Sequence, residues 1–209
     1  MILYEFGYCR STRVHWLLRE VGVEYESVSV DLCKGEQRSP AFLAVNPYGK
    51  LPVLVDGGLT VTESAAICTY LADKYPGSHL IPDPGTAGRA HYYQWTCFCI
   101  AELEPQLWSI RKNMLLYPKA RRSLQAVRVA REEYDLAVQV LDDHLSKHDY
   151  VVGASFGAAD VIICYNLIWA DTLKLLDAYP ALGDYVERLK RRPAFPGHLF
   201  SEKYRRLMR

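Results

Sequence analysis

Hydrophobic and polar positions follow two different periods in the first part of the chain. Residues 2–6 predict a short strand, and the alternation over residues 25–32 predicts a second one. Between them, apolar side chains recur at helical spacing, at Val14, Leu17, Leu18 and Val21. The spacing predicts a helix that is capped by Ser11 or Thr12 and that stops before Gly22, a residue typical of helix C-termini.

A second group of elements follows. Residues 34–45 are polar and irregular, apart from a short helix predicted over 40–44. The pattern then predicts a strand, a hairpin turn, a strand and an apolar helix, in that order: residues 51–55, Asp56-Gly57-Gly58, 59–61 and 64–74. The predicted order of elements in this region is therefore β-α-β-α-β-β-α.

Pro52 conflicts with its place near the start of an apolar strand, because proline cannot donate a hydrogen bond to a sheet ladder. A cis bond between Leu51 and Pro52 resolves the conflict by turning the backbone N–H and C=O of Leu51 outward, and cis is accessible only before proline. We therefore predict an unpaired strand edge beside a helix N-terminus, a suitable receptor for a small peptide that carries a carboxylate.

Residues beyond the hairpin have a different character. Residues 76–86 contain three prolines and two glycines and predict a linker. After it, amphipathic patterns predict only helices, over residues 87–108, 119–146, 157–176 and 182–191. The third is the most apolar and is expected at the core. We predict an α/β domain over 1–76, a linker over 77–86 and an all-helical domain over 87–209.

Composition narrows the functional classes. The 209 residues are 50% hydrophobic and 23% charged, the balance of a globular protein, and the net charge of +1 gives no overall case for binding nucleic acid or an anionic membrane. No apolar run approaches membrane-spanning length, and Met1 leads directly into a strand, so we expect no signal peptide. The six cysteines include no Cys-x-x-Cys pair, and no histidine cluster has metal-ligand spacing. A reducing, cytoplasmic compartment and no metal site are expected.

Two stretches combine residue types at fixed spacing. One is the run Asn46-Pro47-x-Gly49-Lys50-x-Pro52-x-Leu54, followed by Glu63-Ser64 and an apolar helix. The other is Arg13-Val14-x-Trp16-Leu17-Leu18, followed by Gly22-Val23-x-Tyr25-Glu26. Together they resemble the cytosolic glutathione transferase superfamily, in particular its bacterial members, over nearly the whole chain. The resemblance implies a thioredoxin-like N-terminal domain with a mixed four-stranded sheet, a helical-bundle C-terminal domain, a homodimer and a role in detoxification.

The resemblance also implies how glutathione is held. The backbone of Leu51, which precedes Pro52, would pair with the cysteinyl unit, and Glu63 with Ser64 would take the γ-glutamyl end. The physics agrees independently, because a helix N-terminus attracts a carboxylate and a serine hydroxyl can donate to it. Lys50 is the first candidate for the glycyl carboxylate, and Gln37 and Lys34 are weaker ones. The alternative is that Glu63 and Ser64 only cap a helix and that the other three side chains are solvated.

The group that handles the thiol should lie between the first strand and the first helix. A thiol with a pKa near 8.5 must lose about two pKa units, about 2.7 kcal/mol, to be bound as a thiolate at neutral pH. A hydroxyl hydrogen bond together with a helix N-terminus can supply this order of stabilisation. Family members use tyrosine, serine or cysteine here, and we rank Ser11 first, Cys9 second and Tyr8 third. Ser11 as a simple N-cap and Cys9 as an inert loop thiol remain open.

The predicted function is a glutathione transferase that activates the thiol of glutathione to attack a small hydrophobic electrophile. The helical domain would supply the wall for that electrophile. One alternative is a thiol oxidoreductase in which Cys9 forms a mixed disulfide with glutathione. Another is a non-catalytic binding module with the same fold. In the helical domain, Gly157 and Asp160 resemble the family's capping box, to which we assign a structural role.

Overall fold

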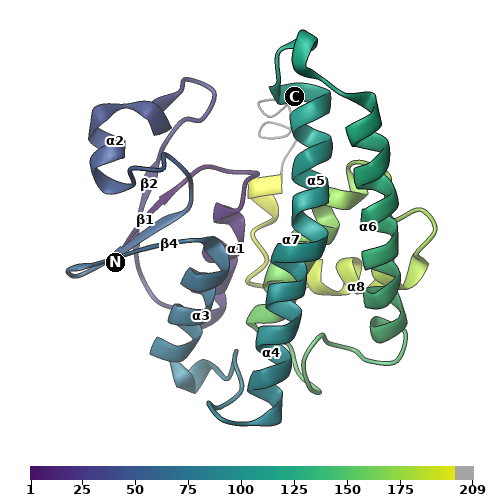
Figure 1. Cartoon of the computed structure of the whole chain (residues 1–209). Helices are drawn as coiled ribbons and strands as arrows, with labels where there is room; N and C mark the ends of the chain where they lie inside the picture. Colours follow the sequence, from purple (N-terminus) through teal and green to yellow (C-terminus); the bar gives the residue numbers. More distant parts are fainter. Residues whose placement is uncertain (201–209) are drawn as a thin grey trace. The chain divides into compact units, whose positions relative to one another are not determined.

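The computed structural model describes residues 1–200 (Figure 1). Internal contacts divide the chain into two units, of which the first combines Met1–Ile81 with the segment that begins at Arg192, and the second is Pro82–Arg191. This differs from the linear division predicted from the sequence, because the segment after Arg191 returns to the first unit. Residues 201–209, which that division assigned to the helical domain, lie outside the described residues.

The first unit contains a four-stranded sheet in the order β2-β1-β3-β4. Its strands are β1 (Ile2–Glu5), β2 (Glu26–Ser29), β3 (Val53–Asp56) and β4 (Leu59–Thr62). Strand β1 runs parallel to β2 and antiparallel to β3, and β3 pairs antiparallel with β4. The sheet is therefore mixed and has the thioredoxin-like arrangement that we predicted.

Three helices accompany the sheet, namely α1 (Ser11–Val21), α2 (Pro40–Val45) and α3 (Ser64–Lys74). Helix α1 ends as predicted, since Gly22 has a left-handed φ of 76° and its N–H donates to the Leu18 carbonyl. The predicted N-cap is wrong. Arg10 occupies the cap position, no side chain caps the helix, and both Ser11 and Thr12 lie inside the helix and are buried.

The hairpin of the first unit has the predicted chemistry and slightly different limits. The Leu51–Pro52 bond is cis, as predicted. Strand β3 begins only at Val53, so Leu51 and Pro52 precede the strand that the hydrophobic pattern had begun at Leu51. Strand β2 is also shorter than the alternation over 25–32 predicted, because the chain turns at Asp31, whose carboxylate accepts from the N–H of Cys33.

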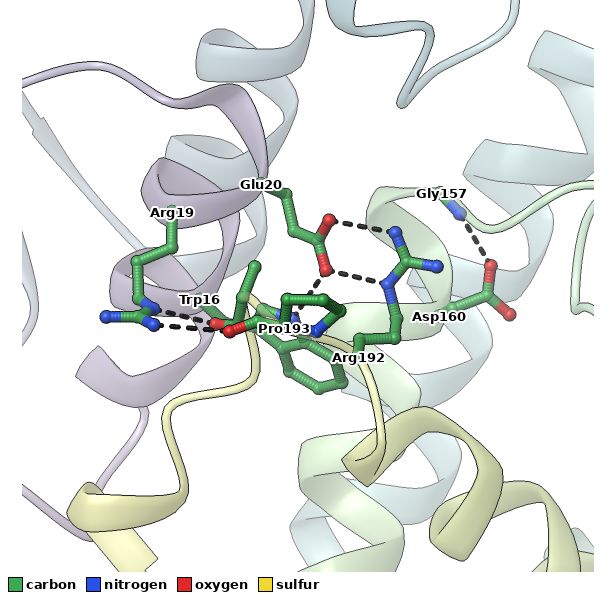
Figure 2. Close-up of polar contacts among 8 residues, drawn as sticks. Trp16, Arg19, Glu20, Gly157, Asp160, Arg192 and Pro193 are labelled. Carbon is green, nitrogen blue, oxygen red and sulfur yellow. Dashed lines mark hydrogen bonds and ion pairs between the residues drawn. The ribbon is translucent and has the colours of Figure 1, made fainter.

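Residues 192–200, which we call the closing segment, bind to α1 (Figure 2). The guanidinium of Arg192 donates to both carboxylate oxygens of Glu20, at 2.7 and 2.9 Å, and Glu20 also accepts from the indole N–H of Trp16 at 2.9 Å. Arg19 in turn donates to the carbonyls of Pro193 and Ala194. The segment is thus held by charged groups at the C-terminal half of α1.

Aromatic rings extend the contact between the closing segment and α1 towards the start of the helix. The ring of Phe195 lies edge-on against Trp16, with 5.0 Å between centroids, and stacks on Phe200 at 5.3 Å. Phe200 then lies edge-on against Tyr8, at 6.1 Å. The closing segment therefore runs along α1 to the loop that precedes it.

The second unit is helical throughout its regular structure. Its α-helices are α4 (Ala87–Phe98), α5 (Glu104–Arg111), α6 (Leu124–Leu145), α7 (Ala158–Asp171) and α8 (Pro180–Lys190). Two π-helical turns, Cys99–Leu103 and Lys112–Leu116, follow α4 and α5, so the helical run predicted to stop near residue 108 continues further. Helix α7 is buried from Ala158 to Ala170, which confirms its predicted core position.

The start of α7 has the predicted capping interaction. Asp160 is fully buried and accepts from the backbone N–H of Gly157 at 2.8 Å (Figure 2). Its other oxygen accepts from the N–H of Val151 at 2.9 Å and from the hydroxyl of Tyr185 at 2.6 Å. Asp160 therefore joins a loop, α7 and α8 within one unit. Among the described residues, no helix combines the length and apolar character needed to cross a membrane.

Candidate glutathione-binding site

Strand register brings three predicted parts of the site to one end of the sheet. Tyr4 of β1 is paired with Val53 of β3, and Val53 is paired with Thr62 of β4. The loop that follows β1, the cis Leu51–Pro52 bond that precedes β3 and the Glu63-Ser64 pair that follows β4 therefore leave the sheet at the same edge. Separate sequence signals thus converge on one place in the first unit.

In the loop after β1, the side chains of Cys9 and Ser11 are in contact. Their Sγ and Oγ atoms are 3.1 Å apart. The Ser11 hydroxyl accepts from the N–H of Phe6 at 3.4 Å, and the Cys9 thiol donates to the carbonyl of the same residue at 3.0 Å. Because the Cys9 thiol donates its hydrogen bond to that carbonyl, its sulfur atom can accept a hydrogen bond from the Ser11 hydroxyl. Ser11 is accordingly oriented as a donor towards a sulfur atom.

Cys9 is held as a neutral thiol. Burial raises the pKa of the Cys9 thiol, and the hydrogen bond from Ser11 only partly opposes this effect. The carboxylate of Glu5 raises it further, whereas the charge of Arg10 lowers it. Since the thiolate is the nucleophilic form, the resting state of Cys9 is poorly suited to attack a disulfide.

Exposure separates the three candidates for handling the thiol. Ser11 has no exposed surface, whereas Cys9 and Tyr8 are half-buried. The Ser11 hydroxyl is therefore closed to solvent, and the sulfur of Cys9 is in contact with it. Tyr8 has a positive φ of 60°, an uncommon conformation for a residue with a side chain, and its ring lies against Phe200.

The turn before the cis proline is built by Asn46. Its side chain donates to the carbonyl of Lys50 at 2.8 Å and accepts from the N–H of Tyr48 at 3.1 Å. Gly49 has a φ of 63°, and a Cβ there would lie 2.8 Å from the carbonyl oxygen of Gln37. This turn thus needs both asparagine and glycine, which explains their place in the motif, and it sets the backbone of Lys50 and Leu51.

The predicted binding residues around this turn differ in exposure. Leu51 is half-buried and packs against a cluster of Val30, Phe42 and Val53, while Pro52 is buried. Lys50 is exposed, with its ammonium 5.6 Å from the centroid of the Tyr48 ring. Gln37 lies against the same turn, and its buried Oε1 atom has no hydrogen-bond partner among the described residues. A buried acceptor of this kind suits a ligand that offers an N–H group.

At the start of α3, Glu63 and Ser64 do not serve as side-chain caps. Glu63 is the cap residue, with a φ of 64° and a ψ of 111°, and its exposed side chain makes no capping hydrogen bond. Ser64 is buried, and its hydroxyl accepts from the guanidinium of Arg13 at 3.1 Å. The alternative reading, in which Glu63 and Ser64 only cap the helix through their side chains, is therefore not observed. Backbone strain of this type tends to occur at functional sites.

Arg13 has a connection to the site that the sequence did not reveal. It is fully buried in α1 and reaches the first residue of α3. A sequence signal existed, because Arg13 lies four residues before Leu17 and so shares the apolar face of its helix. A charged residue at such a position is seldom buried without a specific partner.

The fold consists of a thioredoxin-like domain, in which the predicted site residues lie at one end of the sheet, followed by a helical domain. Comparison with known families agrees, because the family described as glutathione S-transferase, N-terminal domain, matches residues 1–73 and the one described as glutathione S-transferase, C-terminal domain, matches residues 119–188. The chain is 34% identical to glutathione S-transferase F10 of Arabidopsis thaliana over 77% of this chain and 76% of that protein. The chain therefore belongs to the glutathione S-transferase family.

Two further comparisons bear on the chemistry. A sphingomonad glutathione S-transferase, whose structure was solved as a complex with glutathione, is 33% identical, with a TM-score of 0.84 over 97% of this chain and 99% of that one. The disulfide-bond oxidoreductase YfcG of Escherichia coli K12 is 32% identical over 87% of this chain and 86% of that protein. The proteins similar to this chain thus include both a glutathione transferase and a disulfide-bond oxidoreductase.

Proposed function

We propose that this protein binds glutathione in its first unit and transfers it to a small hydrophobic electrophile. The backbone of Leu51 pairs with the cysteinyl unit, and Glu63 and Ser64 hold the γ-glutamyl end at the N-terminus of α3. Lys50 and Gln37 serve the glycyl end. The likeness to a transferase whose structure contains glutathione supports this assignment.

In the proposed reaction, glutathione loses its thiol proton to solvent and is bound as a thiolate, which forms a carbon–sulfur bond with the electrophile. The electron pair of the broken bond leaves with a halide or another leaving group, or it stays on the opened epoxide or the conjugated acceptor. The hydroxyl of Ser11 donates a hydrogen bond to the thiolate, which lowers the pKa of the glutathione thiol. The protein thus acts by positioning and by electrostatic stabilisation.

The observation that carries this proposal is the Ser11 hydroxyl, which is oriented by the N–H of Phe6 and lies 3.1 Å from a sulfur atom. Replacing Ser11 by alanine should slow conjugation of a model electrophile about tenfold or more while glutathione still binds. Thr12→Val is the matched control, because this neighbouring hydroxyl is also buried on α1 but has no hydrogen-bond partner among the described residues. An unchanged turnover of Ser11→Ala would exclude Ser11 from the mechanism.

The second candidate function is a thiol oxidoreductase that uses Cys9. It is favoured by the similarity to a disulfide-bond oxidoreductase, whereas the raised pKa of the buried Cys9 thiol weighs against it. In that reaction the Cys9 thiolate attacks oxidised glutathione, forms a mixed disulfide and releases one glutathione. A mass increase at Cys9 after treatment with oxidised glutathione, and loss of reductase activity in Cys9→Ser, would support it.

The remaining parts of the proposal follow from the family. We propose a homodimer located in the cytoplasm, with a linker near residues 77–86. All six cysteines are free thiols, which suits a reducing compartment. Retention on immobilised glutathione, followed by sedimentation analysis, tests binding and oligomeric state together. Failure to bind would favour the third alternative, a module without catalytic activity.

A further inference from the structure

The connection between α5 and α6, at one end of the second unit, is strongly basic (Figure 1). Residues 111–122, which we call the tip, contain Arg111, Lys112, Lys119, Arg121 and Arg122. Residues 105–131 contain no aspartate or glutamate, although the net charge of the whole chain is only +1. The near-neutral balance of the chain therefore conceals a strong local excess of positive charge in the second unit.

The tip also exposes apolar side chains. Met114, Leu115 and Leu116 follow one another in the π-helical turn after α5, and their exposed fractions are 44, 41 and 51%. Leu124, the first residue of α6, is 83% exposed. Single apolar side chains are ordinary on a protein surface, but a run of three exposed ones is not. The run is unfavourable in water, and contact with an apolar environment would remove that cost.

Hydrogen bonds within the second unit fix the shape of the tip. The guanidinium of Arg122 donates to the carbonyls of Tyr117 and Leu115, both at 2.8 Å. The side chain of Asn113 accepts from the backbone N–H of Ser123, the cap residue of α6, at 3.1 Å. The cations and the apolar run are therefore presented together on a defined turn.

The cations of the tip gather around an aromatic ring. The Arg121 guanidinium lies 5.2 Å from the centroid of the Tyr117 ring, and the Lys112 ammonium lies 5.9 Å from it. Lys119 and Arg121 are exposed, and among the described residues no carboxylate forms an ion pair with either. Long cationic side chains beside an aromatic ring suit a membrane–water interface, because their aliphatic stems cover apolar surface while their charged ends stay in water.

We propose that the tip binds the surface of an anionic phospholipid membrane. The cations attract the phosphate-bearing headgroups, and the run from Met114 to Leu116 enters the boundary between headgroups and acyl chains. The attachment is peripheral, since no helix of the described residues could cross a membrane. This inference goes beyond the proposed function, because the tip contains no residue of the proposed glutathione site.

Two other partners fit the tip less well. A nucleic acid would use the cations, but its phosphates offer nothing to a run of aliphatic side chains. A second copy that paired tip with tip around a twofold axis would bring like charges together. An anionic lipid surface uses both the charge and the apolar run.

The test is sedimentation of the protein with vesicles of phosphatidylcholine alone or mixed with phosphatidylglycerol. Wild-type protein should bind the mixed vesicles, bind the neutral ones far more weakly, and be released by high salt. Lys119→Gln combined with Arg121→Gln should weaken binding about 25-fold, because each cation near such a surface contributes roughly a fivefold change in affinity. Leu115→Ser combined with Leu116→Ser should weaken it about tenfold or more.

Matched controls alter similar side chains elsewhere. Lys147→Gln removes an exposed lysine beyond the far end of α6, a helix of 22 residues and therefore about 33 Å long. It should bind like wild type, whereas Lys119→Gln alone should weaken binding about fivefold. Leu59→Ser changes a leucine of the first unit with 44% exposure and should also have no effect. All these side chains are exposed, so an unchanged unfolding temperature shows that each variant is folded.

The outcomes are distinguishable. Failure of wild-type protein to bind the anionic vesicles would overturn the proposal, as would binding that neither double variant weakens. If only the charge variants weaken binding and double-stranded DNA competes with the vesicles, the tip is a site for polyanions and the lipid assignment is wrong. If the leucine variants instead dissociate an oligomer in sedimentation velocity, the apolar run covers a second copy, which also overturns it. Absence of glutathione binding would overturn the proposed function alone.

Discussion

Helices α3 and α7 begin in different ways, although an acidic residue lies in the first turn or at the cap of each. At α7, Asp160 is fully buried and accepts three hydrogen bonds, including one from the N–H of the cap residue Gly157. At α3, the cap residue Glu63 is exposed, has a positive φ and makes no capping bond. The start of α7 is satisfied from within the chain, whereas no side chain caps the start of α3.

This contrast separates structural from functional helix ends. A capped N-terminus has used its donors and contributes stability, while a strained and uncapped one costs stability and is retained for another reason. Substitutions at the two helix starts should therefore change different measurable quantities. The predictions below are ordered from the largest expected effect to the smallest.

Asp160→Ala should destabilise the protein by about 4 kcal/mol, because three buried donors lose their acceptor. Thermal or denaturant unfolding measures this effect, and glutathione affinity of the folded protein should not change. Asp171→Ala, which alters an exposed aspartate near the other end of α7, is the matched control. A loss of glutathione affinity without a loss of stability would contradict the structural role of this helix start.

The stability of the same helix start should depend on pH. Burial raises the pKa of Asp160 from 3.8 to about 6 in the folded protein. The folded state therefore binds this proton more tightly, so the contribution is fully present below about pH 4 and is lost as the pH rises through 6. The difference in unfolding free energy between wild type and Asp160→Asn should fall by about 3 kcal/mol between pH 4 and pH 7. A constant difference would show that Asp160 titrates normally.

Glu63→Gly should have opposite effects on stability and binding. Glycine adopts a positive φ without strain, so the variant should be more stable by about 1 kcal/mol. Loss of the carboxylate should weaken glutathione binding about tenfold, because the ammonium of the γ-glutamyl unit loses a charged acceptor. Titration calorimetry and chemical unfolding measure the two effects. Glu63→Gln keeps the backbone strain and should reproduce only the loss of affinity.

The smallest effect is expected at Cys9, in the loop before α1. If the sulfur of Cys9 competes with glutathione for the Ser11 proton, Cys9→Ala should raise the rate of conjugation about threefold, which corresponds to part of one weak hydrogen bond. Cys9→Ser places a second hydroxyl there and serves as the comparison. Complete loss of activity in both variants would instead identify Cys9 as the reacting thiol.

Local signals in the sequence predicted much of the fold. Gly22 ends α1, the cis bond precedes Pro52, and the continuous apolar run of α7 marks the core. Each of these depends on a few neighbouring residues. The predicted limits of β2 were too long for a related reason, because alternation continues after the strand has turned away at Asp31 and pattern alone does not reveal where pairing ends.

Interactions between distant residues could not be predicted in this way. Arg13 and Ser64 are 51 positions apart, and neither neighbourhood contains a sign of the other. The sequence also marked Glu63 and Ser64 without revealing that the backbone of Glu63 is strained, since any residue can occupy such a position if the surrounding contacts compensate. The residues of the candidate site can therefore be proposed from the sequence, whereas the hydrogen bonds among them cannot.

The closing segment has a consequence for the order in which the chain can fold. Glu20 and Arg192 are 172 positions apart. At the usual rate of synthesis, about ten to thirty seconds therefore pass between the synthesis of α1 and that of the closing segment. The whole second unit is synthesised within that interval. The first unit is thus the first to be started and the last to be finished on the ribosome, and until then the indole of Trp16 has neither the ring of Phe195 nor a carboxylate held by Arg192.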